Sequence, residues 1–136
     1  MPAGKALLVP LIAFFVDNVG RDEPQSDREL EDEAHEILLS VRDLTLRVGG
    51  QELDRPLEDW IVPPTRSDYD LPSGTNVYSC AGLKDVTGKI EPSYYGGVFV
   101  LFPPPEPGTY TIEYGGAATG FGSDYVSVVR STFVVQ

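Results

Sequence analysis

The sequence predicts an all-β fold: an immunoglobulin-like antiparallel β-sandwich with one inserted amphipathic α-helix at about residues 27–42. Two runs of β-branched and aromatic residues, 96–102 and 109–116, flank the proline-rich turn 103–108. A third run, 125–135, follows a glycine-rich stretch and closes the chain. Short apolar runs that end at proline and glycine turns are typical of the closing strands of a sandwich.

The composition limits the possible partners. A length of 136 residues favours a single domain, residues 1–136. The chain has 21 acidic and 10 basic side chains and a net charge of −11, which repels phosphate, so we expect no nucleic-acid partner. No apolar run reaches the length that crosses a bilayer, so we expect no membrane insertion.

The first elements can be assigned from their residue patterns. Residues 6–16 are apolar without polar alternation, which predicts a strand buried on both faces. Pro10 lacks an N–H donor, so this strand should bend or lie at a sheet edge. Ser26 and Glu29 form a capping box that begins the helix. The apolar stripe of the helix has a period of 3.6 residues, so it should pack on the sheet, and it comprises Leu30, Ala34, Ile37, Leu38 and Val41.

The middle of the chain alternates between short strands and loops. Residues 44–48 alternate as a half-buried strand, and residues 60–62 form a short strand that Pro63 and Pro64 should stop. A further short strand is expected at residues 69–72. The remaining segments are predicted as loops: polar residues 51–58, a long partly ordered excursion over 73–95, and a flexible glycine-rich loop over 115–122.

Several segments, in order, resemble a family of exported bacterial proteins of unknown function. The matching residues are 2–7 (Pro-Ala-Gly-Lys-Ala-Leu), 27–30 (Asp-Arg-Glu-Leu), 76–78 (Asn-Val-Tyr), 96–101, and 105–112 (Pro-Glu-Pro-Gly-Thr-Tyr-Thr-Ile). The resemblance spans nearly the whole chain. It implies an immunoglobulin-like sandwich and a secreted or cell-surface location, and the chain looks like an N-terminally shortened member.

The resemblance carries no catalytic residue to this chain. Relatives often have a cysteine where Glu33 stands, an acidic residue where Gly96 stands and a histidine where Tyr110 stands. These departures weaken any transfer of redox or metal chemistry, so the resemblance implies fold and export only.

The residues that most often carry chemistry are sparse. His35 is the only histidine and lies off the apolar stripe of the helix, so we expect it to be exposed. Cys80 is the only cysteine and is interpreted as a small buried hydrophobe, which could link two chains only if it were exposed. No Gly-x-Ser-x-Gly segment is present. We therefore expect no catalytic residue, no cofactor and no metal ligand.

Carboxylates and aromatic residues are the remaining candidates. Paired acids next to aromatic rings are what a glycosidase needs, and the candidates are Asp54, Glu58, Asp68 and Asp70. An excess of acids makes close pairs common by chance, so we expect no pair that is both buried and facing a cleft. Aromatic residues in loop-like segments suit a sugar or peptide surface; they are Trp60, Tyr69, Tyr78, Tyr94, Tyr95 and Phe121.

The sequence thus favours a non-catalytic exported or cell-surface module that is binding or structural, with a small carboxylate-dependent glycoside hydrolase as the alternative. The expected ligand is a carbohydrate or a protein, and the ligand surface is expected at Trp60, Tyr69, Tyr78, Tyr94, Tyr95, Asp68 and Asp70. If the chain lacks N-terminal strands that the resembled family has, as the resemblance implies, a sheet edge is left open near residues 6–16. Such an edge would recruit a second copy, which predicts a homodimer or a strand exchange through Leu7 to Phe15.

Overall fold

A computed structural model describes residues 1–53, 57–120 and 122–136, and its strands form three antiparallel sheets. Sheet A has the order β1 (Leu7–Asp17), β7 (Ser93–Phe102), β4 (Ile61–Arg66). Sheet B has the order β3 (Gln51–Glu52), β2 (Arg42–Val48), β8 (Gly108–Gly120), β9 (Ser123–Val135). A small third sheet pairs β5 (Tyr69–Leu71) with β6 (Gly88–Ile90). The predicted all-β sandwich with an amphipathic helix is confirmed, and its immunoglobulin-like identity stays a prediction.

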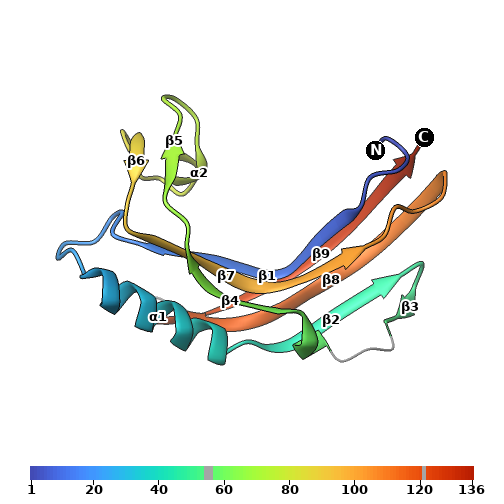
Figure 1. Cartoon of the computed structure of the whole chain (residues 1–136), viewed down its shortest axis with the longest axis horizontal. Coiled ribbons are helices and arrows are strands. Elements are labelled where there is room, and N and C mark those ends of the chain that lie inside the picture. The colour runs from blue at the N-terminus through green and yellow to red at the C-terminus, as the bar shows by residue number, and fades with distance from the viewer. Residues whose placement is uncertain (54–56, 121) are drawn as a thin grey trace.

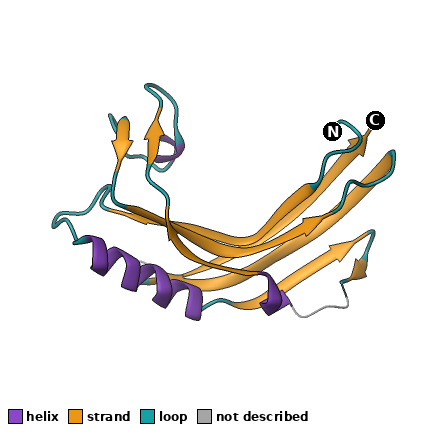
Figure 2. Ribbon diagram, in the orientation of Figure 1, coloured by secondary structure: helices purple, strands orange, loops and turns teal. Residues whose placement is uncertain are grey.

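The sheets are long and curved (Figures 1 and 2). Helix α1 (Asp27–Leu39) lies along the lower side of sheet A at one end, and the β5–β6 pair stands above the same end with the short helix α2 (Val77–Cys80). Both termini lie at the other, upturned end of the sheets, next to the ends of β1 and β9. On the side of sheet A opposite α1 and β2, Figure 1 shows no described helix or strand lying over the sheet between β5–β6 and the termini.

The core fills the space between the two sheets and α1. One cluster of buried residues joins α1 to both sheets and comprises Ile12, Val16, Leu30, Ala34, Ile37, Tyr94 and Ala118. A second cluster lies between the sheets alone and comprises Val9, Leu11, Leu46, Val98, Val100 and Ile112. The helix therefore packs on the sheets, as its stripe predicts, and contacts β1, β4, β7 and β8.

Helix α1 begins as predicted and ends earlier. The capping box of Ser26 and Glu29 is present, with the Ser26 side chain accepting from the Glu29 N–H. The helix ends at Leu39 and not near residue 42, because Ser40 is tied to sheet B: its hydroxyl accepts a hydrogen bond from the Thr119 N–H at 2.7 Å. The chain can then enter β2 at Arg42.

Strand β1 lies at the edge of sheet A, as Pro10 predicts, but it is not buried on both faces. Leu8 is 57% exposed and Phe15 is 48% exposed, so the outward face of β1 is open to solvent at these positions. The register of β1 against β7 shifts between Pro10 and Ile12. Near the shift, Gly97 has φ +151°, and a Cβ there would lie 2.2 Å from the Ile12 carbonyl oxygen, so only glycine fits.

Two strands are longer than predicted: β8 includes most of the predicted glycine-rich loop, and β4 continues past the prolines that were expected to stop it. Residues 115–120 continue β8 up to Gly120, because the glycines allow close approach: a Cβ on Gly115 would lie 2.0 Å from the Ser127 carbonyl oxygen. Strand β4 runs through Pro63 and Pro64, which do not stop it because β4 is an edge strand with a register shift at that point. Within predicted loop 51–58, residues 51–52 form β3, and the 3₁₀ turn η1 (Leu57–Trp60) follows.

Among the described residues, no helix has the length and apolar character needed to cross a membrane.

Candidate functional site

The upper side of sheet A carries a row of four aromatic rings. Phe15 and Tyr95 are cross-strand partners with ring centroids 4.7 Å apart. The row continues from Tyr95 to Phe99 at 5.4 Å and from Phe15 to Tyr69 at 5.4 Å. All three ring pairs are tilted, a geometry that aromatic pairs favour. We call these four residues the aromatic strip.

Aliphatic side chains extend the aromatic strip toward the termini. Pro10 pairs with Phe99, and the next outward-facing pair is Leu8 with Leu101, both of which are exposed. Strand alternation places these residues on one face, while their neighbours Val9, Val98 and Val100 point into the core. The accessible apolar surface consists mainly of Phe15, Leu8 and Leu101, since Phe99 between them is only 9% exposed.

A buried carboxylate lies at the β5 end of the strip. Asp17 ends β1 and is only 6% exposed. Its Oδ2 accepts a hydrogen bond from the Tyr69 hydroxyl at 2.9 Å and another from the Tyr78 hydroxyl, and its Oδ1 accepts from the Val19 N–H at 2.8 Å. The two tyrosine hydroxyls also contact each other. We call Asp17, Tyr69 and Tyr78 the Asp17 cluster.

Local structure explains how Tyr78 reaches Asp17. Asn76 caps α2, with its side-chain oxygen accepting from the Tyr78 N–H at 3.0 Å and the Ser79 N–H at 3.1 Å. The Asn76 amide also donates to the Val86 carbonyl at 2.8 Å. This bond joins the two ends of the segment that connects β5 to β6. The Asp17 cluster therefore fastens β5 and α2 to β1.

The raised pKa values of Tyr69 and Tyr78 fit a structural role, in which their hydroxyls attach β5 and α2 to β1. Burial raises the pKa of Tyr69 to about 12, from an ordinary value of 10.0. Burial, followed by the hydrogen bond to Asp17, raises the pKa of Tyr78 as well. Both phenols therefore stay protonated at neutral pH and act as donors to the carboxylate. A tyrosine that serves as a base or nucleophile must lose that proton.

These pKa shifts predict a loss of stability at alkaline pH. The unfolded chain releases its tyrosine protons near pH 10, while the folded chain keeps the Tyr69 proton until about pH 12. The unfolded state then binds fewer protons, so the free energy of unfolding should fall as pH rises from about 10 to about 12. Below about pH 10 both states are protonated and this contribution is constant. Urea unfolding across this range checks it.

The matched variant for that titration is Tyr69→Phe with Tyr78→Phe, which removes both hydroxyls and keeps both rings. Its free energy of unfolding should depend less steeply on pH above about 10 than that of the wild type. Equal slopes for the two proteins would contradict the assignment.

A cavity of about 370 Å³ lies between the Asp17 cluster and the loop after β1. Its lining residues are Phe15, Asp17, Val19, Gly20, Arg21, Val77 and Tyr78. Arg21 is held in place, because its Nη2 donates to Glu33 at 2.8 Å and its Nε donates to the Asp17 carbonyl at 2.7 Å. Since Phe15 belongs to both, the cavity is continuous with the aromatic strip.

Three residues predicted for the ligand surface come together here: Tyr69, Tyr78 and Tyr95. Tyr94, predicted for the same surface, is in the core, because strand alternation turns it to the opposite face of β7 from Tyr95. Trp60 is partly buried and packs against the core cluster between the sheets.

The predicted carboxylates do not gather in this site. Asp68 accepts from the Arg66 Nε at 3.2 Å, and Asp70 is exposed on β5 opposite Lys89. Asp54 and Phe121 lie outside the described residues, as does the side chain of Glu58. Among the carboxylates that the structure describes, Asp17 is the buried one, and it lines this cavity.

Sequence reasoning missed Asp17, Phe15 and Phe99. The available signal for Asp17 is its place at the end of an apolar strand, where a lone carboxylate that continues the strand must find donors if it is buried. No comparable signal separates Phe15 from the other apolar residues of β1, because which face is covered depends on distant segments.

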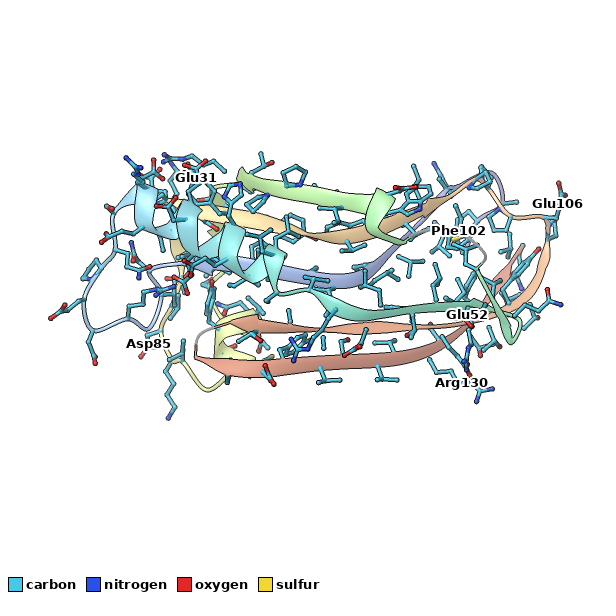
Figure 3. All side chains as sticks on the ribbon, turned by 90° about the horizontal axis from the view of Figure 1, so that it is seen from below. Glu31, Glu52, Asp85, Phe102, Glu106 and Arg130 are labelled. Atoms are coloured by element: carbon cyan, nitrogen blue, oxygen red, sulfur yellow. The ribbon has the colours of Figure 1, made fainter. Side chains whose placement is uncertain are left out.

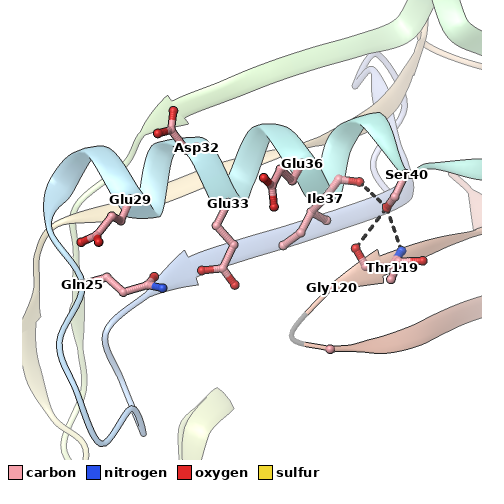
Figure 4. A pocket seen from close by; sticks show the side chains of 10 residues that line it. Gln25, Glu29, Asp32, Glu33, Glu36, Ile37, Ser40, Thr119 and Gly120 are labelled. Carbon is pink, nitrogen blue, oxygen red and sulfur yellow. Dashed lines mark hydrogen bonds between the residues drawn. The ribbon is translucent and has the colours of Figure 1, made fainter.

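A second hollow, of about 550 Å³, lies between α1 and the end of β8 (Figure 4). Its polar walls include Glu29, Asp32, Glu33 and Glu36 along the helix. Within the described part of the chain, no group of three or more histidine, cysteine, aspartate or glutamate side chains is arranged to hold a metal ion. This hollow is an acidic helix surface.

The prediction for His35 is confirmed, and the prediction for Cys80 is wrong. His35 is exposed on α1, as predicted, and its Nδ1 lies 2.9 Å from the Glu31 carbonyl. Cys80 is exposed at the end of α2 and is not the buried hydrophobe that the sequence predicts. The reason is that α2 is too short to present a buried face, and none of its residues is buried.

No protein family, characterised protein or solved structure matches the chain.

Proposed function

We propose that this protein is a non-catalytic binding module that holds its ligand against the aromatic strip on sheet A. The supporting observation is the row Tyr69, Phe15, Tyr95 and Phe99, in which Phe15 is 48% exposed and Phe99 forms a buried base. The exposed pair Leu8 and Leu101 continues this apolar face. Large apolar patches on otherwise solvated proteins commonly mark interaction sites, and aromatic residues contribute most of the energy at such sites.

The chemistry of the strip favours a protein ligand over a carbohydrate. Recognition of a sugar needs free polar groups around the rings, but the hydroxyls of Tyr69 and Tyr78 are engaged by Asp17. Along the rest of the strip the flanking side chains on β1 and β7 are aliphatic, and the hydroxyl of Thr65, the β4 neighbour of Tyr95, donates to the Pro63 carbonyl. The net charge of −11 would favour encounter with a positively charged partner. The proposed ligand is therefore a segment of another protein with apolar side chains and net positive charge.

A non-catalytic role is supported by how the polar groups near the strip are used. The Asp17 carboxylate accepts three hydrogen bonds, and the raised pKa values of Tyr69 and Tyr78 keep both phenols neutral. Each of these groups stabilises the fold in its present protonation state. A reaction at any of them would have to break the hydrogen bonds that attach β5 and α2 to β1.

The proposed location is outside the bacterial cell, secreted or on the surface. It rests on the resemblance of residues 2–7, 27–30 and 105–112 to exported proteins. Immunodetection of the native protein in fractionated cells tests it, and recovery from the cytoplasmic fraction alone would contradict it.

Binding to peptide and glycan arrays tests the function. We expect labelled wild-type protein to bind basic, apolar peptides, and we expect Phe15→Ala to weaken that binding by about tenfold or more, since loss of an aromatic anchor commonly costs at least about 1.4 kcal/mol. The matched control is Tyr110→Ala, which removes a ring stacked on Phe133 in sheet B. Equal losses in the two variants, or binding to glycans alone, would contradict the proposal.

A further inference from the structure

Strand β9 is the edge of sheet B, and the direction of its hydrogen-bonding groups can be worked out. The Gly49 N–H donates to the Thr111 carbonyl, so odd-numbered residues of β8 face β2 and even-numbered residues face β9. Ile112 pairs with Ser131 in a constant register, so odd-numbered residues of β9 face β8. The even-numbered residues of β9 therefore direct their N–H and C=O groups outward.

The outward edge of β9 is covered only at its C-terminal end. There the Met1 amino group donates to the Val134 carbonyl, and the Ala3 N–H donates to the Gln136 carbonyl. From Asp124 to Thr132, no described group of the chain forms a hydrogen bond with this edge. Figure 3 shows β9 along one margin of the molecule, with Arg130 on its outer side.

This edge lacks the features that usually protect a sheet edge from pairing. It contains no proline and no lysine, and its register against β8 has no bulge. The side chains of Val126 and Val128 are 66% and 85% exposed. Its two charged residues are Asp124 and Arg130, so the strand is neutral although the chain carries −11.

We infer that β9 pairs antiparallel with β9 of a second copy of this chain, around a two-fold axis at Ser127. In this register Asp124 lies opposite Arg130 of the second copy, and Val126 lies opposite Val128, each pair occurring twice. All four are even-numbered residues, so their outward groups can form the hydrogen bonds of the ladder. The two B sheets then form one continuous sheet.

Charge complementarity selects this register. Within one chain Arg130 lies 3.2 Å from Glu113, and Asp124 lies 3.1 Å from Arg42. Pairing Arg130 with the second copy's Asp124 produces a row of alternating charges across the interface. A shift by two residues in either direction sets Arg130 opposite an uncharged residue and loses both pairs. Opposite charges across adjacent strands stabilise a sheet, and like charges destabilise it.

The edge of β1 from Leu7 to Phe15, which the sequence predicts as a dimer edge, is less suited to such pairing. Pro10 supplies no donor, and the register shift between Pro10 and Ile12 bends the strand. A homodimer through that edge stays a separate prediction, and the experiment below distinguishes the two.

Sedimentation velocity of the full chain at micromolar concentration, with reductant to keep Cys80 reduced, tests the inference. We expect a dimer for the wild type and at least a tenfold weaker dimer for Arg130→Asp and for Asp124→Arg. The double variant, Asp124→Arg with Arg130→Asp, should restore the dimer. Because the double variant keeps the new repulsions with Glu113 and Arg42 inside each chain, restoration can come only from pairing between chains.

A second pair of variants tests the same edge without changing those charges. Val128→Lys should yield a monomer, whereas Leu101→Lys, which adds the same charge on exposed sheet A, should leave the dimer intact. Circular dichroism and thermal melting confirm that each variant is folded. A monomeric wild type would overturn the inference. So would a dimer that survives Val128→Lys, which would instead point to the Leu7–Phe15 edge.

Discussion

Replacing Leu30 with alanine should lower the free energy of unfolding by about 3 kcal/mol, within the range of about 2–5 kcal/mol for leucine-to-alanine changes in cores. Leu30 is fully buried at the first turn of α1, in the cluster that contains Ile12, Val16 and Tyr94 of sheet A. The change removes apolar burial and leaves a cavity that three rigid elements cannot close. Urea unfolding followed by circular dichroism measures the effect.

The matched control is Leu39→Ala on the same helix. Leu39 is 86% exposed, so its loss should change the free energy of unfolding by less than about 0.5 kcal/mol. Alanine has at least the helix propensity of leucine, so neither change should cost stability through propensity. If both variants lost the same stability, the burial of Leu30 would not be the source of its stabilisation.

Replacing Asp17 with alanine should cost about 3 kcal/mol, because the hydroxyls of Tyr69 and Tyr78 and the Val19 N–H would lose a charged acceptor in a buried place. The loss should also be local: β5, α2 and β6 would separate from β1 before the sheets unfold. Limited proteolysis is expected to cut within residues 72–88 much faster than in the wild type, while urea unfolding reports the total loss.

Asp22→Ala is the control for that variant, since Asp22 is an exposed carboxylate in the loop that follows β1. It should leave both stability and the proteolysis rate unchanged. Asp17→Ala with the same protease sensitivity as Asp22→Ala would show that the excursion is held by contacts other than the Asp17 cluster. Because Tyr69 belongs to both the cluster and the aromatic strip, the first result also predicts a weaker ligand surface in Asp17→Ala.

The elements whose cause lies within a few residues were predictable. The capping box of Ser26 and Glu29 begins α1 as expected, because both partners are three residues apart and form their bonds in any context. The turn over 103–108 connects β7 to β8 for the same reason, since proline and glycine restrict the backbone locally. The strand class of the last third follows from its β-branched and aromatic residues.

The candidate site was only partly predictable. Aromatic residues in the middle of the chain were recognised, and Tyr69, Tyr78 and Tyr95 do meet. Tyr94 was assigned to the same surface although it is buried, since one residue of shift along a strand reverses the face and the sequence does not state which face is covered.

Contacts between distant segments decided the features that the sequence did not predict. Asp17 became a buried acceptor because residues 69 and 78 fold back on the end of β1, and residues 115–120 became strand because β9 approaches closely enough to require glycine at Gly115. The sequence by itself determined the β class, the helix and its start. Only the tertiary structure decided which sheet faces and edges stay open, because covering a face depends on segments far away in the chain, and local propensity carries no information about them.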